Sequence, residues 1–292
     1  MSLDIKYIDS FVLATERGAY GASLFVGKNN KIAADKGAVD EMRNQLNSIN
    51  MKGKVVIGEG EMDEAPMLYI NEKLGTNNGE ELDIAVDPLE GTNFVAKNLP
   101  GALSVLAVAK KGNLLNAPDM YMEKIAIGSG LPKNLVDLDF SLKKNIELLS
   151  EAKNTKPEKL SACIIERPRH KKIVDILKSM NVKINFITDG DVSGVISVSK
   201  SMPNDIYIGT GGAPEGVLAA AALNCLDCQM QTRLSFQNNE EKINAQKLGI
   251  EDLYKKYYIE DMVRGDVIFS ATGVTNGDLV EGIKNKGDYF YS

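Results

Sequence analysis

The sequence contains one histidine, His170, no tryptophan and three cysteines among its 292 residues. A zinc site built mainly from imidazoles is therefore excluded, and any metal site would have to use carboxylates or cysteines. Cys225 and Cys228 have the spacing of half a zinc site or of a redox pair. No second pair completes a structural zinc site, so we expect ordinary buried or half-buried thiols. So few cysteines fit a reducing compartment, and we predict a cytoplasmic protein.

Long apolar runs and a surplus of positive charge are also missing. No stretch approaches the ~20 apolar residues that span a bilayer, and the start, Met1 to Lys6, lacks the pattern of a signal peptide. The net charge of −6 argues against a sequence-independent nucleic-acid binder. We therefore expect neither nucleic acid nor membrane as a partner, whereas a small anionic substrate is compatible because local cations set the field of a cleft. A P-loop kinase is excluded because the sequence has no Gly-x4-Gly-Lys-Ser/Thr motif.

An acidic turn after an apolar run is the most informative stretch. It reads Asp83-Ile84-Ala85-Val86-Asp87-Pro88-Leu89-Glu90-Gly91-Thr92. The apolar run predicts a strand that carries Asp87 to its end, and we expect Pro88 to stop the strand there. Asp87 and Glu90 can then converge on a hard divalent cation. Gly91 lets the backbone approach an anion, and the Thr92 hydroxyl can hold a water. The pattern predicts a metal-dependent phosphatase, in which Asp83 is structural.

Two further acidic segments follow predicted strands. The strand at residues 54–57 leads into residues 58–64, which contain Glu59, Glu61 and Asp63. A solvated loop is the alternative, but the interspersed glycines favour a tight path near a ligand. The strand at residues 205–208 leads to Glu215, where a helix start offers an anion site or forms a plain turn. Since ligands gather at strand ends in α/β sheets, the three acidic clusters predict an all-oxygen site for Mg²⁺ or Mn²⁺.

Two isolated features are ambiguous. The apolar stripe of residues 33–49 predicts a helix with Asp35 in its first turn, where a carboxylate is favoured. On its own, Asp35 is best interpreted as an N-terminal charge. Arg167 and Arg169 lie between a predicted strand and helix and offer two guanidinium groups to a second phosphate, or they are solvated surface. We interpret the adjacent His170 as structural or exposed rather than catalytic.

The second half alternates predicted strands and helices at the length of β-α units. We therefore predict an α/β fold with a mixed sheet in the first half and a mostly parallel sheet in the second. Residues 230–260 are polar and weakly helical. The amino-acid composition of the sequence shifts near residue 140, and we place a domain boundary there. The predicted domains are a metal-binding α+β half at 1–139 and an α/β half at 140–292 that completes the substrate site.

Five blocks then define a resemblance, and they are residues 56–70, 83–92, 116–124, 211–217 and 268–273. In this order they resemble the class II, GlpX-type fructose-1,6-bisphosphatases of bacteria, from near residue 10 to near residue 284. The Asp-Pro-Leu-Glu-Gly-Thr core is also similar to the lithium-sensitive phosphatase superfamily, which includes inositol monophosphatases. Asn71 stands where the family usually has glycine. The resemblance implies a layered α-β-α-β-α sugar-phosphatase fold and, for gluconeogenesis, hydrolysis of the 1-phosphate of D-fructose 1,6-bisphosphate.

The resemblance also implies residue roles by motif position. It assigns Mn²⁺ or Mg²⁺ binding to Asp35, Glu59, Asp87, Leu89 through its carbonyl, Glu90 and Glu215. It assigns substrate binding to Glu90, Gly91, Thr92, Tyr121, Arg167, Pro168, Arg169, Asp189, Gly190, Asp191 and Gly212. Thr92, with Asp35 or Asp63, would orient or deprotonate the attacking water.

The expected partner is a small sugar bisphosphate, and we expect a homo-oligomer, either a dimer or a tetramer. Two alternatives stay open. One is a phosphatase for sedoheptulose 1,7-bisphosphate or an inositol phosphate. The other is a non-catalytic regulator that binds a sugar phosphate.

Overall fold

The computed structural model describes residues 3–58, 67–287 and 289–292. Glu59, Glu61 and Asp63 lie outside the described residues. The chain forms two compact units, Met1–Asn116 with Val263–Ser292 and Ala117–Met262. This division differs from the predicted boundary after residue 139, because the strand that begins at Tyr121 pairs within the second unit. The mixed α/β fold class is confirmed.

The first unit is built on a five-stranded mixed sheet, as predicted for the first half. Its strands lie in the order β11-β4-β3-β1-β2. β1 and β3 are parallel, and the other neighbours are antiparallel. The strands are β1 (Met51–Ile57), β2 (Lys73–Leu74), β3 (Glu80–Glu90), β4 (Leu103–Lys110) and β11 (Val267–Gly273). β11 follows the second unit in the sequence, so the last strand of this sheet is added after the chain has formed the second unit.

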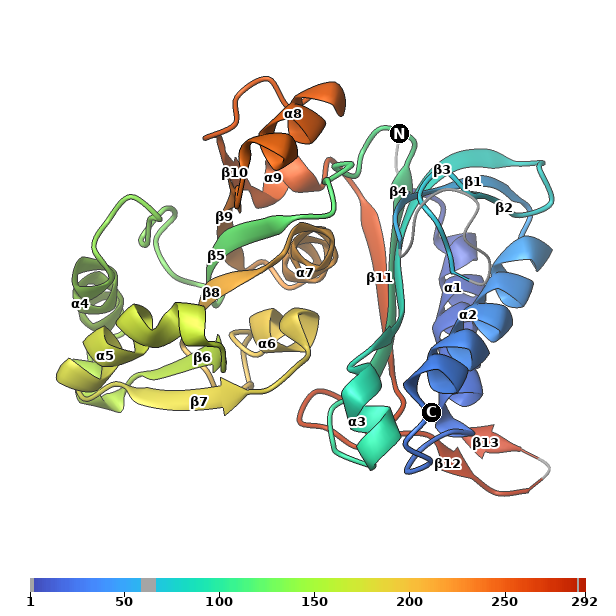
Figure 1. Ribbon diagram of the computed structural model, residues 1–292, viewed down its shortest axis with the longest axis horizontal. Coiled ribbons are helices and arrows are strands. Elements are labelled where there is room, and N and C mark those ends of the chain that lie inside the picture. The colour runs from blue at the N-terminus through green and yellow to red at the C-terminus, as the bar shows by residue number, and fades with distance from the viewer. Residues whose placement is uncertain (1–2, 59–66, 288) are drawn as a thin grey trace. The chain divides into compact units, whose positions relative to one another are not determined.

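Two long helices lie on one face of this sheet (Figure 1). They are α1 (Ile8–Ser23) and α2 (Lys31–Ser48). The helices approach closely where Gly21 meets Gly37, because a Cβ on either residue would collide with the backbone of the other. The predicted apolar stripe of α2 is buried, and its Val39, Met42 and Leu46 pack in one core with Phe11 of α1 and the apolar residues of β1, β3 and β4. The amphipathic pattern was thus sufficient to predict this face.

Short elements complete the described part of the first unit. They are η1 (Ile5–Tyr7), α3 (Thr92–Lys97), β12 (Lys284–Asn285) and β13 (Phe290–Tyr291). The Phe290 ring stacks on Tyr20 of α1, with 4.9 Å between the ring centroids. Asn71 has a left-handed backbone with φ of +75°. Glycine and asparagine tolerate this conformation best, which explains why asparagine can stand at a position where the resembling family has glycine.

The second unit is built on a six-stranded sheet in the order β10-β9-β5-β8-β6-β7. Its strands are β5 (Tyr121–Ile127), β6 (Ser161–Ile165), β7 (Lys183–Ile187), β8 (Ile206–Gly212), β9 (Gln229–Ser235) and β10 (Lys256–Tyr258). The prediction of a mostly parallel sheet was wrong, because the pairs β10–β9, β9–β5 and β5–β8 are antiparallel. β8 and β9 do run parallel, as their connecting helix requires. β5 lies antiparallel between them, and it precedes the segment from which the parallel sheet was predicted.

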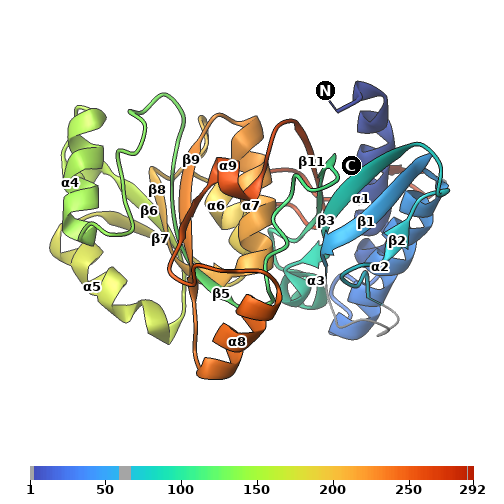
Figure 2. The same cartoon turned by 90° about the horizontal axis from the view of Figure 1, so that it is seen from above.

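Helices cover both faces of the second sheet (Figures 1 and 2). α4 (Leu142–Ala152) and α5 (Lys171–Ser179) lie on one face, and they pack on Ile125 and Ile206. α6 (Asp191–Ile196) and α7 (Ala213–Cys225) lie on the other. The remaining helical elements are η2 (Pro157–Lys159), η3 (Pro168–His170), α8 (Asn239–Lys247) and α9 (Ile259–Met262).

Strand β9 was not predicted, because polar side chains alternate along it. Gln231 and Thr232 are nevertheless buried. The Gln231 amide donates to the carbonyl of Val136 at 2.9 Å and accepts from the N–H of Leu138 at 3.1 Å. These bonds satisfy the amide, so burial costs little. In the described part of the chain, no helix is both long and apolar enough to cross a membrane.

Candidate active site

A bulge in β3 places Asp87 and Glu90 on one face of the first sheet. Asp87 pairs with Val105 of β4 and Glu90 pairs with Leu103, so three steps along β3 match two along β4. Residues three apart in a regular strand point to opposite faces, and the extra residue of a bulge cancels that inversion. The prediction that Pro88 ends the strand was wrong. Proline is accommodated because a bulged residue donates no ladder hydrogen bond.

The bulge leads directly into α3 through a left-handed glycine. Gly91 has φ of +84° and precedes Thr92, the first helical residue, which is half-buried. The N–H of Leu89 donates to Oδ1 of Asp87 at 3.1 Å. Leu89 and Glu90 are buried, with 2% and 4% exposure. The carboxylates and the hydroxyl predicted to act together therefore belong to one short strand-to-helix turn.

Asp35 is on α2, beside the core that surrounds this turn. The Asn30 side chain caps α2 by accepting from the N–H of Ala33 at 3.0 Å. The helix thus starts at Lys31, and the prediction that Asp35 lies in the first turn was wrong. Its neighbour Ala34 packs in the same apolar cluster as Leu89. Oδ1 of Asp35 is buried without a hydrogen-bond partner among the described residues, and burial raises the pKa of this carboxyl.

Glu215 lies in the first turn of α7, immediately after β8. Its Oε2 is also buried and lacks a hydrogen-bond partner within the described ranges. Burial raises the pKa of Glu215, and the nearby charge of Lys124 opposes this shift. A Cβ on Gly212 would collide with the Glu215 carboxylate. Glycine at position 212 therefore leaves room for the Glu215 carboxylate, whereas the substrate contact predicted for Gly212 stays a prediction.

A buried polar network that the sequence analysis missed lies beside Glu215. Lys124, on β5, is fully buried and forms an ion pair with Asp191, at the start of α6. The hydroxyl of Tyr207 donates to the other oxygen of Asp191. A Cβ on Gly211 would collide with the Asp191 carboxylate. The signal that could have revealed this network is Lys124 itself, a charged residue inside an apolar strand.

Arg169 is held at the end of β8. Its Nε and Nη2 donate to the carbonyl of Thr210 at 3.0 and 2.7 Å. The guanidinium lies over the Tyr121 ring, 4.7 Å from the ring centroid, where a cation is attracted to the aromatic face. Thus two residues predicted to bind substrate, Tyr121 and Arg169, are in contact.

Arg167 lies at a neighbouring strand end. Its Nη1 donates to the carbonyls of Glu166 and Thr188, each at 2.9 Å. Pro168 follows at the start of η3. Gly190 has φ of +83° and its N–H donates to Oδ1 of Asp189 at 3.2 Å. The second unit therefore gathers the predicted residues of three segments at the ends of β6, β7 and β8.

Asp83 has the structural role that we predicted. Its Oδ2 accepts from the N–H groups of Gly112 and Leu114 at 2.6 and 3.4 Å. It therefore stabilises the turn after β4, and burial raises the pKa of its carboxyl.

The donor set fits a hard divalent cation. A buried carboxylate oxygen without a partner is unfavourable unless a proton or a cation accompanies it, and both Asp35 and Glu215 present such an oxygen. Within the residues that the structure describes, no group of three or more potential ligand side chains is assembled. Two predicted contributors, Glu59 and Asp63, lie outside that part of the chain.

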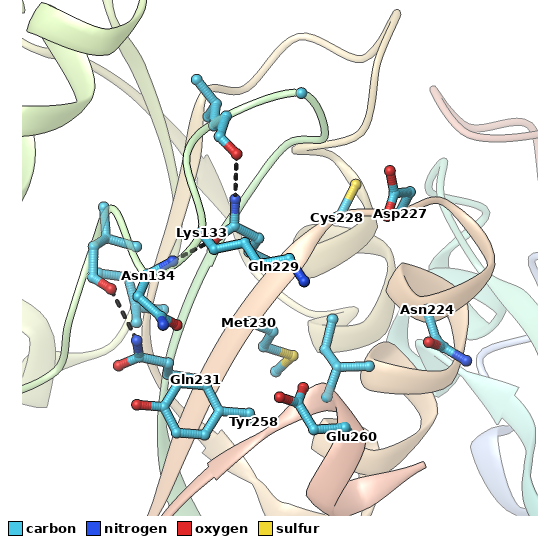
Figure 3. A pocket seen from close by; sticks show the side chains of 15 residues that line it. Lys133, Asn134, Asn224, Asp227, Cys228, Gln229, Met230, Gln231, Tyr258 and Glu260 are labelled. Atoms are coloured by element: carbon cyan, nitrogen blue, oxygen red, sulfur yellow. Dashed lines mark hydrogen bonds between the residues drawn. The ribbon is translucent and has the colours of Figure 1, made fainter. Parts of the chain in front are cut away.

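A separate pocket of the second unit does not involve the predicted residues (Figure 3). It measures about 440 Å³ and is lined by the turn at Lys133 and Asn134, by β9 and by residues near Glu260. Gln229 donates to the carbonyls of Leu131 and Pro132 at 3.0 and 3.1 Å. The side-chain amides of Gln229 and Gln231 therefore hold residues 131–138 against β9.

Known proteins show similarity over nearly the whole chain. Residues 6–292 match the family model for bacterial fructose-1,6-bisphosphatase, glpX-encoded. The fructose-1,6-bisphosphatase 1 class 2 of Escherichia coli K12 is 44% identical over 295 aligned positions, covering 95% of this chain and 87% of that protein. The class 2 enzyme of Haemophilus influenzae is 41% identical with the same coverage. The extragenic suppressor protein suhB of Bartonella henselae is 10% identical over 67% of this chain and 74% of that one, with a TM-score of 0.40.

Proposed function

The chain belongs to the bacterial, glpX-encoded fructose-1,6-bisphosphatase family, and we propose that it hydrolyses the 1-phosphate of D-fructose 1,6-bisphosphate for gluconeogenesis. The products are fructose 6-phosphate and phosphate. The observation that carries this proposal is the β3 bulge, which puts Asp87 and Glu90 on one face directly before Thr92. Two carboxylates and a hydroxyl so arranged suit the metal-dependent hydrolysis of a phosphate ester.

Divalent-metal dependence follows from the family, and we propose Mn²⁺ or Mg²⁺ as the ion. The residues that would hold it are Asp35, Glu59, Asp87, Glu90, Glu215 and the carbonyl of Leu89. Such a cation, when bound, neutralises charge on the phosphoryl oxygens and lowers the pKa of a bound water. Thr92, with Asp35 or Asp63, orients the attacking water. Because Thr92 begins α3 after a rigid left-handed turn, its hydroxyl is preorganised for this role.

The phosphate that stays on the sugar would be bound by Arg167 and Arg169. The bonds from Nε and Nη2 to the carbonyl of Thr210 fix the orientation of the Arg169 guanidinium. A guanidinium held in this way recognises phosphate without losing much further side-chain entropy. The other proposed substrate residues are Glu90, Gly91, Tyr121, Pro168, Asp189, Gly190, Asp191 and Gly212.

Substitution of the two bulge carboxylates tests this function. Asp87→Ala and Glu90→Ala should each abolish phosphate release from fructose 1,6-bisphosphate, because each removes a proposed ligand of the metal ion. Circular dichroism should show an intact fold. Glu81→Ala is the matched control, since Glu81 is an exposed carboxylate of the same strand that pairs with Lys111 at 2.9 Å. Full activity in either bulge variant, at ordinary Mn²⁺ or Mg²⁺, would refute the assignment.

A further inference from the structure

His170 is the one imidazole of the chain, and both of its ring nitrogens have backbone partners. Nδ1 lies 2.7 Å from the carbonyl oxygen of Ile165, and the N–H of Thr210 donates to Nε2 at 2.8 Å. Because a carbonyl only accepts and an N–H only donates, Nδ1 must carry the proton and Nε2 must offer a lone pair. The contacts thus define one tautomer of a neutral ring.

The ring is built into the end of β8. It is 1% exposed, and it packs directly on the strand backbone at Gly209. A Cβ on Gly209 would lie 3.2 Å from Cε1 and 3.3 Å from Nε2 of the imidazole, closer than ordinary van der Waals contact. The position of the imidazole therefore constrains the β8 backbone by both packing and hydrogen bonding.

Thr210 connects this ring to Arg169. Its N–H is held by His170, and its carbonyl accepts from two nitrogens of Arg169. These groups belong to the two peptide units that share the Cα of Thr210, so a shift of this residue moves both its N–H and its carbonyl. The buried histidine thereby sets the orientation of the exposed arginine that follows Pro168.

We propose that His170 is a positioning residue, whose neutral imidazole fixes Thr210 and, through it, aims the Arg169 guanidinium at the phosphate that remains on the sugar. The inference rests on the proposed function, which gives Arg169 its role in substrate binding. It adds a requirement for one charge state of a side chain that does not itself touch the substrate.

The proposal makes phosphate binding sensitive to pH. A proton on Nε2 would set an N–H against the N–H of Thr210 and break that contact. The charged groups nearest the ring are Arg169 and Asp191. Burial lowers the pKa of His170 below its ordinary 6.5, Arg169 acts in the same direction, and Asp191 opposes it. Tyr207 also lies near Gly209 but stays neutral, because burial raises the pKa of its hydroxyl well above the ordinary value.

Two variants distinguish the hydrogen bond between His170 and Thr210 from the packing of the imidazole ring. His170→Gln keeps an acceptor at the position of Nε2, whereas His170→Asn keeps a donor toward Ile165 but is too short to reach Thr210. Calorimetry on the Mn²⁺-loaded protein would give the dissociation constant for fructose 6-phosphate between pH 5 and 8. We expect the dissociation constant of His170→Asn to rise by about tenfold, the effect of one lost hydrogen bond. His170→Gln should bind like wild type at pH 8. On acidification below pH 6.5 the wild type should weaken more steeply than His170→Gln.

Two further readouts distinguish positioning from a general structural role. His170→Asn should raise KM for fructose 1,6-bisphosphate by about the same tenfold, with kcat changed less than about twofold. Because the chain has a single histidine, its Cε1 proton can be followed by NMR without assignment. The pKa from this resonance should fall when fructose 6-phosphate is added, since a ligand that prefers the neutral ring also favours its deprotonation.

The proposal is overturned if His170→Asn binds fructose 6-phosphate as wild type does, or if both variants lose affinity equally. It also fails if kcat alone falls, if wild type does not bind fructose 6-phosphate, or if the ligand leaves the imidazole pKa unchanged. Should His170→Asn not fold, the pH profiles of wild type and His170→Gln and the NMR titration still decide. Failure of the proposed function would give a different result. The wild-type protein would then bind fructose 6-phosphate but release no phosphate from fructose 1,6-bisphosphate.

Discussion

At the residue scale, the site depends on side chains whose own neighbours do not fully satisfy them. Oδ1 of Asp35 and Oε2 of Glu215 are each buried, and neither has a hydrogen-bond partner in the described ranges. Most buried polar atoms of native proteins are paired. Such an oxygen is therefore expected where a ligand completes the structure, and each of the two carboxylates is a proposed ligand of a divalent cation.

Gly212 makes room for one of these carboxylates. Gly212→Ala would place a methyl group where the Glu215 carboxylate lies. Disturbing the surroundings that hold a metal ligand in place typically lowers metal affinity or activity by about 10–100-fold. We expect a loss of that size in phosphate release, with the dependence on Mn²⁺ shifted to higher concentration.

Gly249→Ala is the control for this substitution. A Cβ at Gly249 meets no atom within 4 Å, although its φ of +90° makes alanine strained there. That variant should lose stability but not activity. Full activity of Gly212→Ala at limiting Mn²⁺ would contradict this prediction, because activity would then not depend on the present position of the Glu215 carboxylate.

His170 also predicts how stability depends on pH. The folded protein favours the neutral ring, because burial lowers its pKa below 6.5. The unfolded chain therefore binds the proton first as pH falls, and stability is lost below about pH 6.5. We expect the free energy of unfolding of wild type to fall relative to His170→Gln between pH 7 and 5. Urea titrations of both proteins measure this difference, and parallel pH profiles would contradict it.

At the scale of elements, the bulge in β3 and the buried ion pair of β5 show what a sequence can and cannot predict. The apolar run before Asp87 predicted a strand, and Glu90-Gly91-Thr92 predicted a turn at its end. The bulge was not predictable, because it depends on the register with β4. A proline next to a strand end is compatible with either a stop or a bulge.

Lys124 exemplifies a second limit. Its partner Asp191 is distant in sequence and reaches it only because α6 starts beside β5. Removing one partner of a buried ion pair leaves the other charge uncompensated, at a cost of about 3–5 kcal/mol. Lys124→Met should lower the free energy of unfolding by about this amount, as measured by urea unfolding.

An exposed pair gives the matched comparison. Lys171 and Asp175 form an exposed i,i+4 pair on α5 at 3.2 Å, so Lys171→Met should leave stability almost unchanged. If Lys124→Met were as stable as wild type, the network around Asp191 would not be an important part of the second unit.

At the scale of the whole molecule, the chain leaves the first unit after Asn116 and returns to it at Val263. The sequence predicted most of the strands and helices, because their apolar periodicity is clear. It did not predict which strands become neighbours. β5 and β11 both pair with strands distant in sequence, and such pairing follows from tertiary packing rather than from local pattern. Polar β9 was missed for the same reason, since the burial of Gln231 depends on its hydrogen bonds to the loop at Val136 and Leu138.

Metal-dependent turnover is the common requirement of the proposed residue roles. The most direct test is phosphate release from fructose 1,6-bisphosphate by this protein, measured with Mn²⁺, with EDTA, and after Mn²⁺ is restored in excess of EDTA. We predict release with Mn²⁺, none with EDTA, and full recovery on restoration. Release that persists in EDTA, or no release in any of the three conditions, would contradict this account.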